Sequence, residues 1–234
     1  MSKGNSLVIV LEGFYTIVFS AIIVAQSAEI ESKKQEIETK EQKIEESFKE
    51  YSDMKGKFYE GLLNEFQHDV GRWNAVLSKE DLSIKFFMDE NSPKVMFKPG
   101  VGRQTDYYDE LIQDFCPRYY SVINPMIESS LITEIKVEGH TSSEWTGGGR
   151  EGESYYLNLG LSQDRAKNVM ESCLRSIEAS RGNEYVPFRK KMTASGVAFS
   201  KIILDSSGSE NAGASRRVEF KIITSYDDNL RSIR

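Results

Sequence analysis

YYLNLGLSQDRAKNV, residues 155–169, opens the segment that decides how the C-terminal part of this 234-residue chain folds. Apolar side chains recur at helical spacing from here onward, at Leu161, Val169, Cys173 and Ile177. This spacing predicts an amphipathic helix over residues 161–179 with one face against a core. Ser162 suits the N-cap or first turn of that helix, because its hydroxyl can accept a hydrogen bond from an otherwise unpaired backbone N–H.

Strands and loops are predicted on both sides of this helix. Five segments alternate or are rich in β-branched residues, namely LSIKFFM (82–88), VMFKPGVG (95–102, running into a glycine turn), EIKVEG (134–139), KMTASGVAF (191–199) and RRVEFKIIT (216–224). A further helix is predicted over residues 106–127, with Pro117 expected to kink or end its first part. Loops are expected at TSSEWTGGGREGES (141–154) and DSSGSENAGAS (205–215). The order β-β-α-β-α-β-β predicts an α+β domain over residues 78–225, with helices packed on one side of a small mixed sheet, and a tail over residues 226–234.

The N-terminal run LVIVLEGFYTIVFSAIIVAQ, residues 7–26, is long and apolar enough to cross a membrane as a helix. We expect a transmembrane helix over residues 7–27 after a short cytoplasmic tail over residues 1–6. A cleaved signal peptide is the alternative, since Lys3 is basic and Ala25-Gln26-Ser27 resembles a cleavage site. Glu12 lies within the run, where an ionisable group is costly and usually functional. The alternative for Glu12 is a position close enough to the cytoplasmic interface to reach water.

A charged segment over residues 28–77 is expected to be a helical connector. Its apolar residues recur every seven positions, at Ile30, Ile37, Ile44, Tyr51 and Phe58. Such a repeat predicts a helix that packs against a parallel copy of itself, and hence a homodimer. The companion core positions are poor, so a single solvated helix is the alternative. One continuous helix from about Leu7 to Phe66 would be roughly 90 Å long.

Composition and motifs exclude several classes of function. A formal charge of −6 without a basic stripe argues against nucleic acid as a partner. A metal site is not expected, because Cys116 and Cys173 lack metal-ligand spacing and only His68 and His140 are available. His140 is expected to be a structural residue at the end of a strand. No catalytic spacing or phosphate loop is found, so neither enzymatic activity nor a cofactor is expected. Whether the two cysteines form a disulfide stays open at this point.

Three motifs together resemble the OmpA-like peptidoglycan-binding domain, namely EIKVEGHTSSEW (134–145), YYLNLGLSQDRAKNV (155–169) and SGSENAGASRRVEFKI (207–222). The resemblance implies that Arg165 holds the diaminopimelate carboxylate of a peptidoglycan stem peptide, with Asn158 and Leu161 shaping the pocket. The chemistry suits this role, because an arginine fork and the free N–H groups of a helix start both favour a carboxylate.

The chain departs from the OmpA-like pattern at one position. Where the family usually has an aspartate that pairs with the ligand's amine, this chain has Ser142, and Glu144 is the candidate to supply the charge. Arg216 and Arg217 of the final strand are the remaining candidates to line the pocket, with a place at the sheet edge as the alternative. We therefore expect peptidoglycan binding that is weaker or differently selective.

A single apolar helix with one carboxylate, a connector and such a domain resembles the MotB type of stator subunit. GHTSSEW with DSSGSENAGASRRVEF is similar to the ZorB subunit of Zorya anti-phage defence systems. The resemblance implies a cell inner-membrane protein with a cytoplasmic N-terminus and a periplasmic C-terminal domain. It implies two copies inside a ring of MotA/ZorA-like subunits, with Glu12 carrying a proton or sodium ion. A flagellar-type stator subunit and a passive membrane-to-peptidoglycan tether without ion transport are the alternatives.

Overall fold

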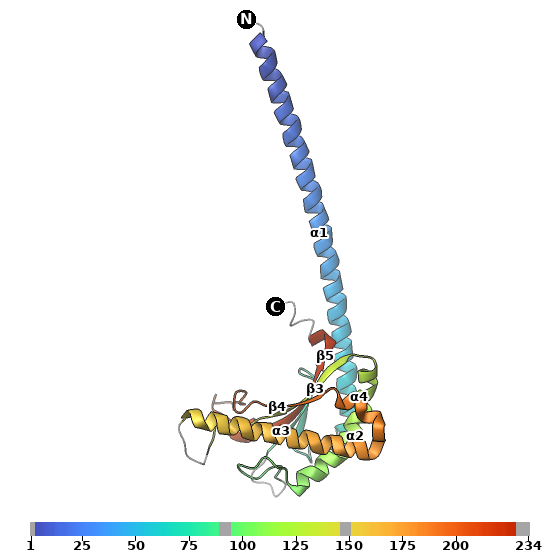
Figure 1. The fold of residues 1–234 in the computed structure, drawn as a ribbon, viewed down its shortest axis with the longest axis vertical. Coiled ribbons are helices and arrows are strands. Elements are labelled where there is room, and N and C mark those ends of the chain that lie inside the picture. Colours follow the sequence, from blue (N-terminus) through green and yellow to red (C-terminus); the bar gives the residue numbers. More distant parts are fainter. Residues whose placement is uncertain (1–2, 89–94, 146–150, 228–234) are drawn as a thin grey trace. The chain divides into compact units, whose positions relative to one another are not determined.

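The computed structural model describes residues 3–88, 95–145 and 151–227, with side chains from residue 19 onward apart from that of Glu151. The chain divides into two compact units, residues 1–52 and residues 53–234. Helix α1 (Lys3–Phe66) supplies the first unit and is drawn from dark to light blue in Figure 1. The single long helix predicted from about Leu7 to Phe66 is confirmed.

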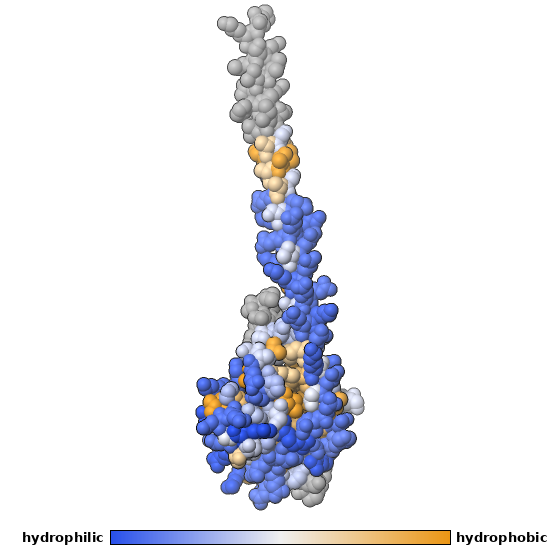
Figure 2. Space-filling view, turned by 90° about the vertical axis from the view of Figure 1, so that its right-hand side faces the viewer, coloured by the Kyte–Doolittle hydropathy of each residue, from blue (hydrophilic) through white to orange (hydrophobic). Residues whose placement is uncertain are grey.

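The described surface of α1 in the first unit changes from apolar to charged along the helix (Figure 2). Its first described turns expose large apolar side chains in several directions, at Phe19, Ile22, Ile23 and Val24. The turns that follow carry ion pairs at i,i+4 spacing, Glu29–Lys33 at 2.8 Å and Glu36–Lys40 at 2.6 Å. Pairs at this spacing favour the helix only modestly, because water and salt screen exposed charges. Charged pairs thus support this part of α1.

In the part of the chain whose side chains are described, no helix combines the length and the apolar character that crossing a membrane requires. Residues 7–18 of the predicted transmembrane segment, with Glu12 among them, lie outside the described side chains. The apolar members of the seven-residue repeat are each more than half exposed at Ile30, Ile37 and Ile44.

The second unit is built on one five-stranded sheet in the order β1-β2-β5-β3-β4. Its strands are β1 (Ala75–Ser78), β2 (Ser83–Phe87), β3 (Ile132–Gly139), β4 (Met192–Gly196) and β5 (Arg217–Thr224). All neighbouring strands are antiparallel except β3 and β4, which are parallel. The α+β class, the small mixed sheet and the order β-β-α-β-α-β-β agree with the prediction.

One predicted strand is wrong. Residues 95–102 make a single bridge, between Phe97 and Gln104, because Pro99 and Gly100 turn the chain there. Gly100 has a φ of +67°, which favours glycine. The place of this strand is taken by β1, whose four residues are too few to show a clear alternation in the sequence.

Two long helices lie against one face of the sheet, α2 (Asp106–Glu128) and α3 (Glu151–Arg181) (Figure 1). The short turns η1 (Gly182–Tyr185), α4 (Val186–Arg189) and α5 (Ala212–Ser215) complete the order. α2 does not end at Pro117, which lies in its interior with buried side chains on both sides. A proline in a helix interior costs about 3 kcal/mol, and burial of the neighbouring aromatic side chains offsets that cost.

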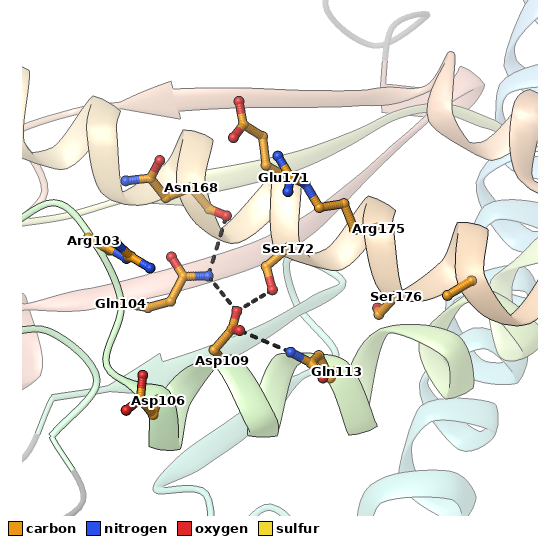
Figure 3. A pocket seen from close by; sticks show the side chains of 11 residues that line it. Arg103, Gln104, Asp106, Asp109, Gln113, Asn168, Glu171, Ser172, Arg175 and Ser176 are labelled. Carbon is orange, nitrogen blue, oxygen red and sulfur yellow. Dashed lines mark hydrogen bonds between the residues drawn. The ribbon is translucent and has the colours of Figure 1, made fainter.

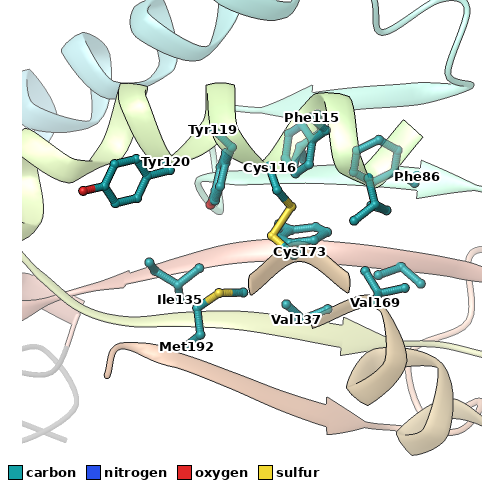
Figure 4. Close-up of a cluster of buried hydrophobic side chains, with 14 of the residues drawn as sticks. Phe86, Phe115, Cys116, Tyr119, Tyr120, Ile135, Val137, Val169, Cys173 and Met192 are labelled. Carbon is teal, nitrogen blue, oxygen red and sulfur yellow. A yellow bond between two sulfur atoms is a disulfide. The ribbon is translucent and has the colours of Figure 1, made fainter. Parts of the chain in front are cut away.

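The core lies between these helices and the sheet (Figure 4). Phe115 of α2 contacts Phe86 of β2 and Phe220 of β5, with ring centroids 5.2 and 5.1 Å apart. A disulfide joins Cys116 of α2 to Cys173 of α3, and their Cα atoms are 5.3 Å apart. The pairing that the sequence left open is therefore present, and it ties the two long helices together.

The last turns of α1 belong to the second unit. Phe58, Leu62 and Phe66 are each at most 2% exposed and lie in the core. The domain start predicted at residue 78 is therefore too late, since the compact unit begins at Asp53. The charged composition of the connector concealed these three core positions.

Arg118 of α2 fixes this end of α1. Its Nε donates to Glu65 Oε1 at 2.6 Å, and its Nη2 donates to the Glu65 carbonyl at 2.9 Å and to Asp69 Oδ2 at 2.6 Å. Its guanidinium also lies 4.9 Å from the centroid of the Phe66 ring. Charge-assisted bonds and a cation–π contact thus attach the end of α1 to α2.

Candidate functional site

α3 passes very close to the sheet where β3 and β4 end. A Cβ at Gly139 would lie 2.2 Å from the Ser162 carbonyl oxygen, and a Cβ at Gly196 would lie 2.2 Å from the Gln163 backbone nitrogen. Neither distance leaves room for a side chain. The two glycines therefore permit the close approach that brings the predicted site residues of α3 to the end of β3.

The turn after β4 joins these elements through Ala198. The Ala198 N–H donates to Ser162 Oγ at 3.0 Å, and the Ala198 carbonyl accepts from the Thr141 N–H at 2.9 Å. Ala198 is fully buried and has a φ of +50°, which is uncommon for a residue with a Cβ. Such strained positions persist only where the surroundings hold them. Four elements meet here: the end of β3 at Gly139, the middle of α3 at Ser162, the turn at Ala198 and the start of β5 at Arg217. We call this region the junction.

Ser162 is not at a helix start. Because α3 begins at Glu151, Ser162 lies in the helix interior, where its hydroxyl donates to the Leu159 carbonyl at 2.9 Å. The predicted N-cap is therefore wrong, and so is the prediction of free helix N-terminal N–H groups beside Arg165. Gly152, which falls in the loop predicted over residues 141–154, and Gly160 are both accommodated within α3.

Arg165 lies buried beneath the segment that follows β2 and is 3% exposed. Its Nε donates to the Val101 carbonyl at 3.3 Å and its Nη2 to the Lys98 carbonyl at 3.5 Å. The guanidinium also lies 4.9 Å from the centroid of the Phe97 ring. The backbone of this segment therefore helps to fix the direction of the guanidinium.

Buried polar atoms without a described partner gather around the junction. Asn158, one turn before Ser162 on α3, is 2% exposed, and its Nδ2 has no hydrogen-bond partner among the described residues. The same holds for Thr141 Oγ1 and Trp145 Nε1 on the segment after β3. An unpaired buried polar group costs about 1–3 kcal/mol. All three groups can donate, so a ligand here would be rich in carbonyl or carboxylate oxygens. Leu161 is half-buried nearby in sequence.

Ser142 lies beside Arg216, which immediately precedes β5. Arg216 Nη1 donates to Ser142 Oγ at 3.0 Å and to Glu144 Oε2 at 2.7 Å. Glu144 thus lies next to Ser142, where the sequence suggested a substitute carboxylate. Between them, the Ser143 N–H donates to Glu210 Oε1 at 3.0 Å. Nothing in the sequence pointed to Glu210, because the contact spans two loops far apart along the chain.

Arg217 points away from the junction, contrary to the prediction that it lines the pocket. Successive residues of a strand face opposite sides of the sheet, so Arg217 lies on the face away from the helices. Its Nε donates to Glu219 Oε1 at 2.5 Å, and its Nη1 donates to the carbonyls of Lys201 and Ser215 at 3.2 Å. Of the two adjacent arginines, Arg216 contacts Ser142, whereas Arg217 is buried and bonded to other residues of the domain.

Glu138, His140 and Glu219 form a buried group on the same sheet face as Arg217. Their potential ligand atoms lie within 4.8 Å of one another, which makes the group a candidate metal site. However, Lys201 Nζ lies 2.7 Å from Glu138 Oε1 and Arg217 Nε lies 2.5 Å from Glu219 Oε1, so both carboxylates are already balanced. A divalent cation would add two uncompensated charges. The group therefore fits an internal ion-pair network better than a metal centre.

His140 is almost fully buried in this network. Its Nε2 lies 3.2 Å from Glu138 Oε1 and 3.5 Å from Glu219 Oε1, without the geometry of a hydrogen bond. Burial is the main cause that lowers the pKa of His140, so the imidazole is neutral near pH 7. Its position is that of a structural residue just after β3.

Acid is expected to weaken this network. Burial alone would raise the pKa of Glu138, but contacts with His140 and Lys201 outweigh burial and hold that pKa at about 2. A lowered carboxylate pKa adds stability above the unfolded-state pKa, and this stability is lost as the pH falls through the folded-state pKa. We expect the free energy of unfolding to fall between pH 4.5 and about pH 2, and Lys201→Met to move that loss to higher pH. Urea unfolding at a series of pH values measures the shift.

Lys136→Met is the matched control for Lys201→Met. Lys136 lies on the same strand as Glu138 but pairs with Glu134, at 3.5 Å. Its pH profile is expected to follow that of the unmodified chain. A Lys201→Met profile that coincides with both would show that Lys201 does not hold the pKa of Glu138 low.

Comparison with known proteins gives one strong relative and a shared fold. No family model matches the sequence. The Zorya protein ZorB of Escherichia coli (strain ATCC 8739, Crooks) is 32% identical over 183 residues, which cover 78% of this chain and 74% of that protein. A MotB-like protein from Desulfovibrio vulgaris matches in structure with a TM-score of 0.51 and 19% identity, over 74% of this chain and 93% of that chain. The cell wall anchor of the T6SS from Pseudomonas aeruginosa matches with a TM-score of 0.47 and 18% identity, over 70% of this chain and 97% of that chain.

Proposed function

The chain belongs to the ZorB family, and from that membership we propose that it is the peptidoglycan-anchoring B subunit of an ion-driven motor in the inner membrane. In this proposal the C-terminal domain holds the cell wall and the N-terminal helix lies in the membrane. Two copies work inside a ring of MotA/ZorA-like subunits, and the motor serves anti-phage defence. The role is mechanical and electrical and requires no enzymatic step.

The observation that carries the anchoring role is the composition of the junction. Arg165 lies three positions after Ser162 on α3, and the buried donors Asn158 Nδ2 and Thr141 Oγ1 have no hydrogen-bond partner among the described residues. A peptidoglycan stem peptide supplies carboxylates for an arginine and carbonyl oxygens for such donors. In the proposal Arg165 holds the diaminopimelate carboxylate, and Asn158 and Leu161 shape the pocket.

Glu144 takes the place of the usual aspartate in this proposal. It lies beside Ser142 and shares the guanidinium of Arg216 with it. A carboxylate already paired with an arginine attracts an amine less strongly than a free one. The site would therefore hold the stem-peptide carboxylate more firmly than its amine, which makes binding weaker or differently selective.

The disulfide supports a periplasmic C-terminal domain. Cys116 and Cys173 are bonded in the core between α2 and α3. Disulfides persist in oxidising compartments such as the periplasm and are rare in the bacterial cytoplasm. A periplasmic domain after a single membrane helix implies a cytoplasmic N-terminus.

The N-terminal end of α1 supports the membrane assignment. Large apolar side chains at Phe19, Ile22, Ile23 and Val24 are 48–68% exposed and cover more than one side of the helix. Lipid is the environment that would bury such a surface. In the proposal residues 7–27 cross the membrane and Glu12 carries the ion, since an ionisable group within a membrane helix is costly and usually functional.

The exposed seven-residue repeat supports a dimer. Ile30, Ile37 and Ile44 would pack against the same residues of a second copy in a parallel coiled coil. Because the companion positions are polar, this coil would be weak alone. In the proposal the membrane anchors keep the two helices close enough for it to form.

Two substitutions test the motor and the anchor. Glu12→Gln removes the titrating group and Arg165→Ala removes the carboxylate ligand, so each is expected to reduce phage protection to the level of cells without the chain. The measurement is phage plating efficiency in cells that express the chain with its ring-forming partner. Glu12→Asp keeps a carboxylate and Arg165→Lys keeps a charge, so both are expected to retain part of the protection. Immunoblots of the membrane fraction confirm equal amounts of each variant.

The alternatives give different outcomes. A passive tether predicts full protection with Glu12→Gln and none with Arg165→Ala. A flagellar-type stator predicts that motility, rather than phage plating, responds to both substitutions. Full protection with both would contradict the motor and the anchor together.

A further inference from the structure

A polar groove of about 630 Å³ runs between α2 and α3, outside the junction (Figure 3). Both helices and the segment before α2 contribute to its walls. Its lining consists of amides, hydroxyls and one small apolar residue, together with two arginines, Arg103 and Arg175, and three acids, Asp106, Asp109 and Glu171. The groove therefore offers hydrogen bonds and charges and contains no aromatic surface.

The central acid of the groove is fully used within the protein. Asp109 Oδ1 accepts from Ser172 Oγ at 2.5 Å and from Gln104 Nε2 at 3.2 Å, and Asp109 Oδ2 accepts from Gln113 Nε2 at 2.9 Å. Figure 3 shows these bonds converging on Asp109 from both helices and from the segment before α2. They fix the amides of Gln104 and Gln113, whose carbonyl oxygens accept no hydrogen bond from a described donor. The floor of the groove is thus a fixed polar surface in which Asp109 is occupied, while Asp106 and Glu171 are the further acids of the lining.

Unlike Asp109, the two arginines of the groove have no described partner. Neither Arg103 nor Arg175 makes a hydrogen bond or an ion pair with any residue that the structure describes. Arg103 comes from the segment before α2 and Arg175 from α3, and Figure 3 shows the floor residues Gln104 and Ser172 between them. Two unpaired guanidinium groups in a lining that also holds Asp106 and Glu171 suit a ligand that carries amino groups as well as carboxylates, as a peptide does.

The groove and the junction share one segment of chain. The Gly102 carbonyl accepts from Asn168 Nδ2, which lines the groove, at 3.0 Å. The Val101 carbonyl, one residue earlier, accepts from Arg165 Nε at 3.3 Å. Asn168 and Arg165 are three positions apart on α3, so they are neighbours on its surface. The groove therefore begins about one turn beyond Arg165 along α3.

We propose that this groove is a second binding site for extended, carboxylate-bearing peptide, taken from the same peptidoglycan whose stem peptide occupies the junction. The inference rests on the proposed anchoring function. Arg103 and Arg175 would each hold a carboxylate, while the amide oxygens of Gln104 and Gln113 accept N–H groups of the peptide backbone. The junction would then recognise one stem peptide, and the groove would add affinity only for material large enough to reach both sites.

Binding of the full-length, detergent-solubilised chain to two probes tests this assignment. The probes are insoluble sacculi, measured by co-sedimentation, and a soluble disaccharide tetrapeptide that contains diaminopimelate, measured by calorimetry. The Arg103→Gln/Arg175→Gln double variant is expected to bind sacculi about ten-fold more weakly, since two charge-assisted contacts are lost. Its affinity for the small soluble probe is expected to stay unchanged. Lys79→Gln/Lys190→Gln removes the same charge from exposed positions outside the groove and is expected to bind sacculi normally.

Each other outcome overturns the assignment. Equal sacculus binding by the groove variant and the unmodified chain would exclude peptidoglycan from the groove. The same exclusion follows if the groove variant instead loses its membrane partner on co-purification, which would make the groove a protein-docking site. Equal weakening in the lysine control would reduce the effect to non-specific charge. If the unmodified chain binds neither probe, the anchoring function itself fails. If only Arg165→Ala loses binding to sacculi, the anchoring function stands and the groove has no part in it.

Discussion

Gly139→Ala is expected to lower the free energy of unfolding of the C-terminal domain by about 3 kcal/mol or more. The added Cβ would lie 2.2 Å from the Ser162 carbonyl oxygen and 3.1 Å from its carbonyl carbon. Both atoms belong to backbone in the middle of a long helix, so neither can rotate away as a side chain would. α3 would have to move off the sheet, which would open the core beneath it. Urea unfolding followed by circular dichroism measures the change.

Gly160→Ala is the matched control, since it makes the same chemical change within α3. A Cβ at Gly160 meets no atom within 4 Å. Alanine is favoured over glycine in a helix interior by about 0.5–1 kcal/mol, so this variant is expected to be slightly more stable than the unmodified chain. If both variants unfold at the same urea concentration, α3 does not approach β3 as closely as described.

Removal of the disulfide is expected to have a comparable effect. Cys116 and Cys173 are 57 positions apart, and a loop of that size corresponds to about 4 kcal/mol in the chain-entropy account of cross-links. The Cys116→Ala/Cys173→Ala double variant is therefore expected to unfold at a much lower urea concentration. The same loss is expected when the unmodified chain is reduced, which separates the cross-link from any packing change caused by alanine. Equal stability of the oxidised and reduced chains would show that the bond adds nothing to the fold.

Elements with a regular pattern were accessible from the sequence, and those set by distant contacts were not. The alternation of β2, β3 and β5 and the helical spacing after Leu161 predicted the α+β class and the element order. β1 was missed because its four residues show no clear period. The early start of α3 was missed because Gly152 ends a glycine-rich run that usually favours a loop, while helix packing overrides that tendency here.

The sequence offered candidate site residues, and the packing of the chain decided which of them lie close together. The motif residues Ser142, Asn158 and Arg165 are brought to the end of β3, but the choice between Arg216 and Arg217 depended on strand register. A shift of one residue turns a side chain to the other face of the sheet, and the sequence did not fix that register. The groove could not be predicted from the sequence, because Arg103 and Arg175 come from segments that only the packing of α2 on α3 brings together.

The way in which α1 ends has a mechanical consequence. Its last turns carry Phe58, Leu62 and Phe66 into the core, and Arg118 grips the same end through Glu65 and Asp69. A pull or twist delivered through these turns would load the interior directly, with no slack tether to absorb it. To detach this end of α1, three apolar side chains would have to leave the core while the Arg118 guanidinium lost its hydrogen bonds. Such an attachment resists force stiffly up to a threshold and then fails abruptly.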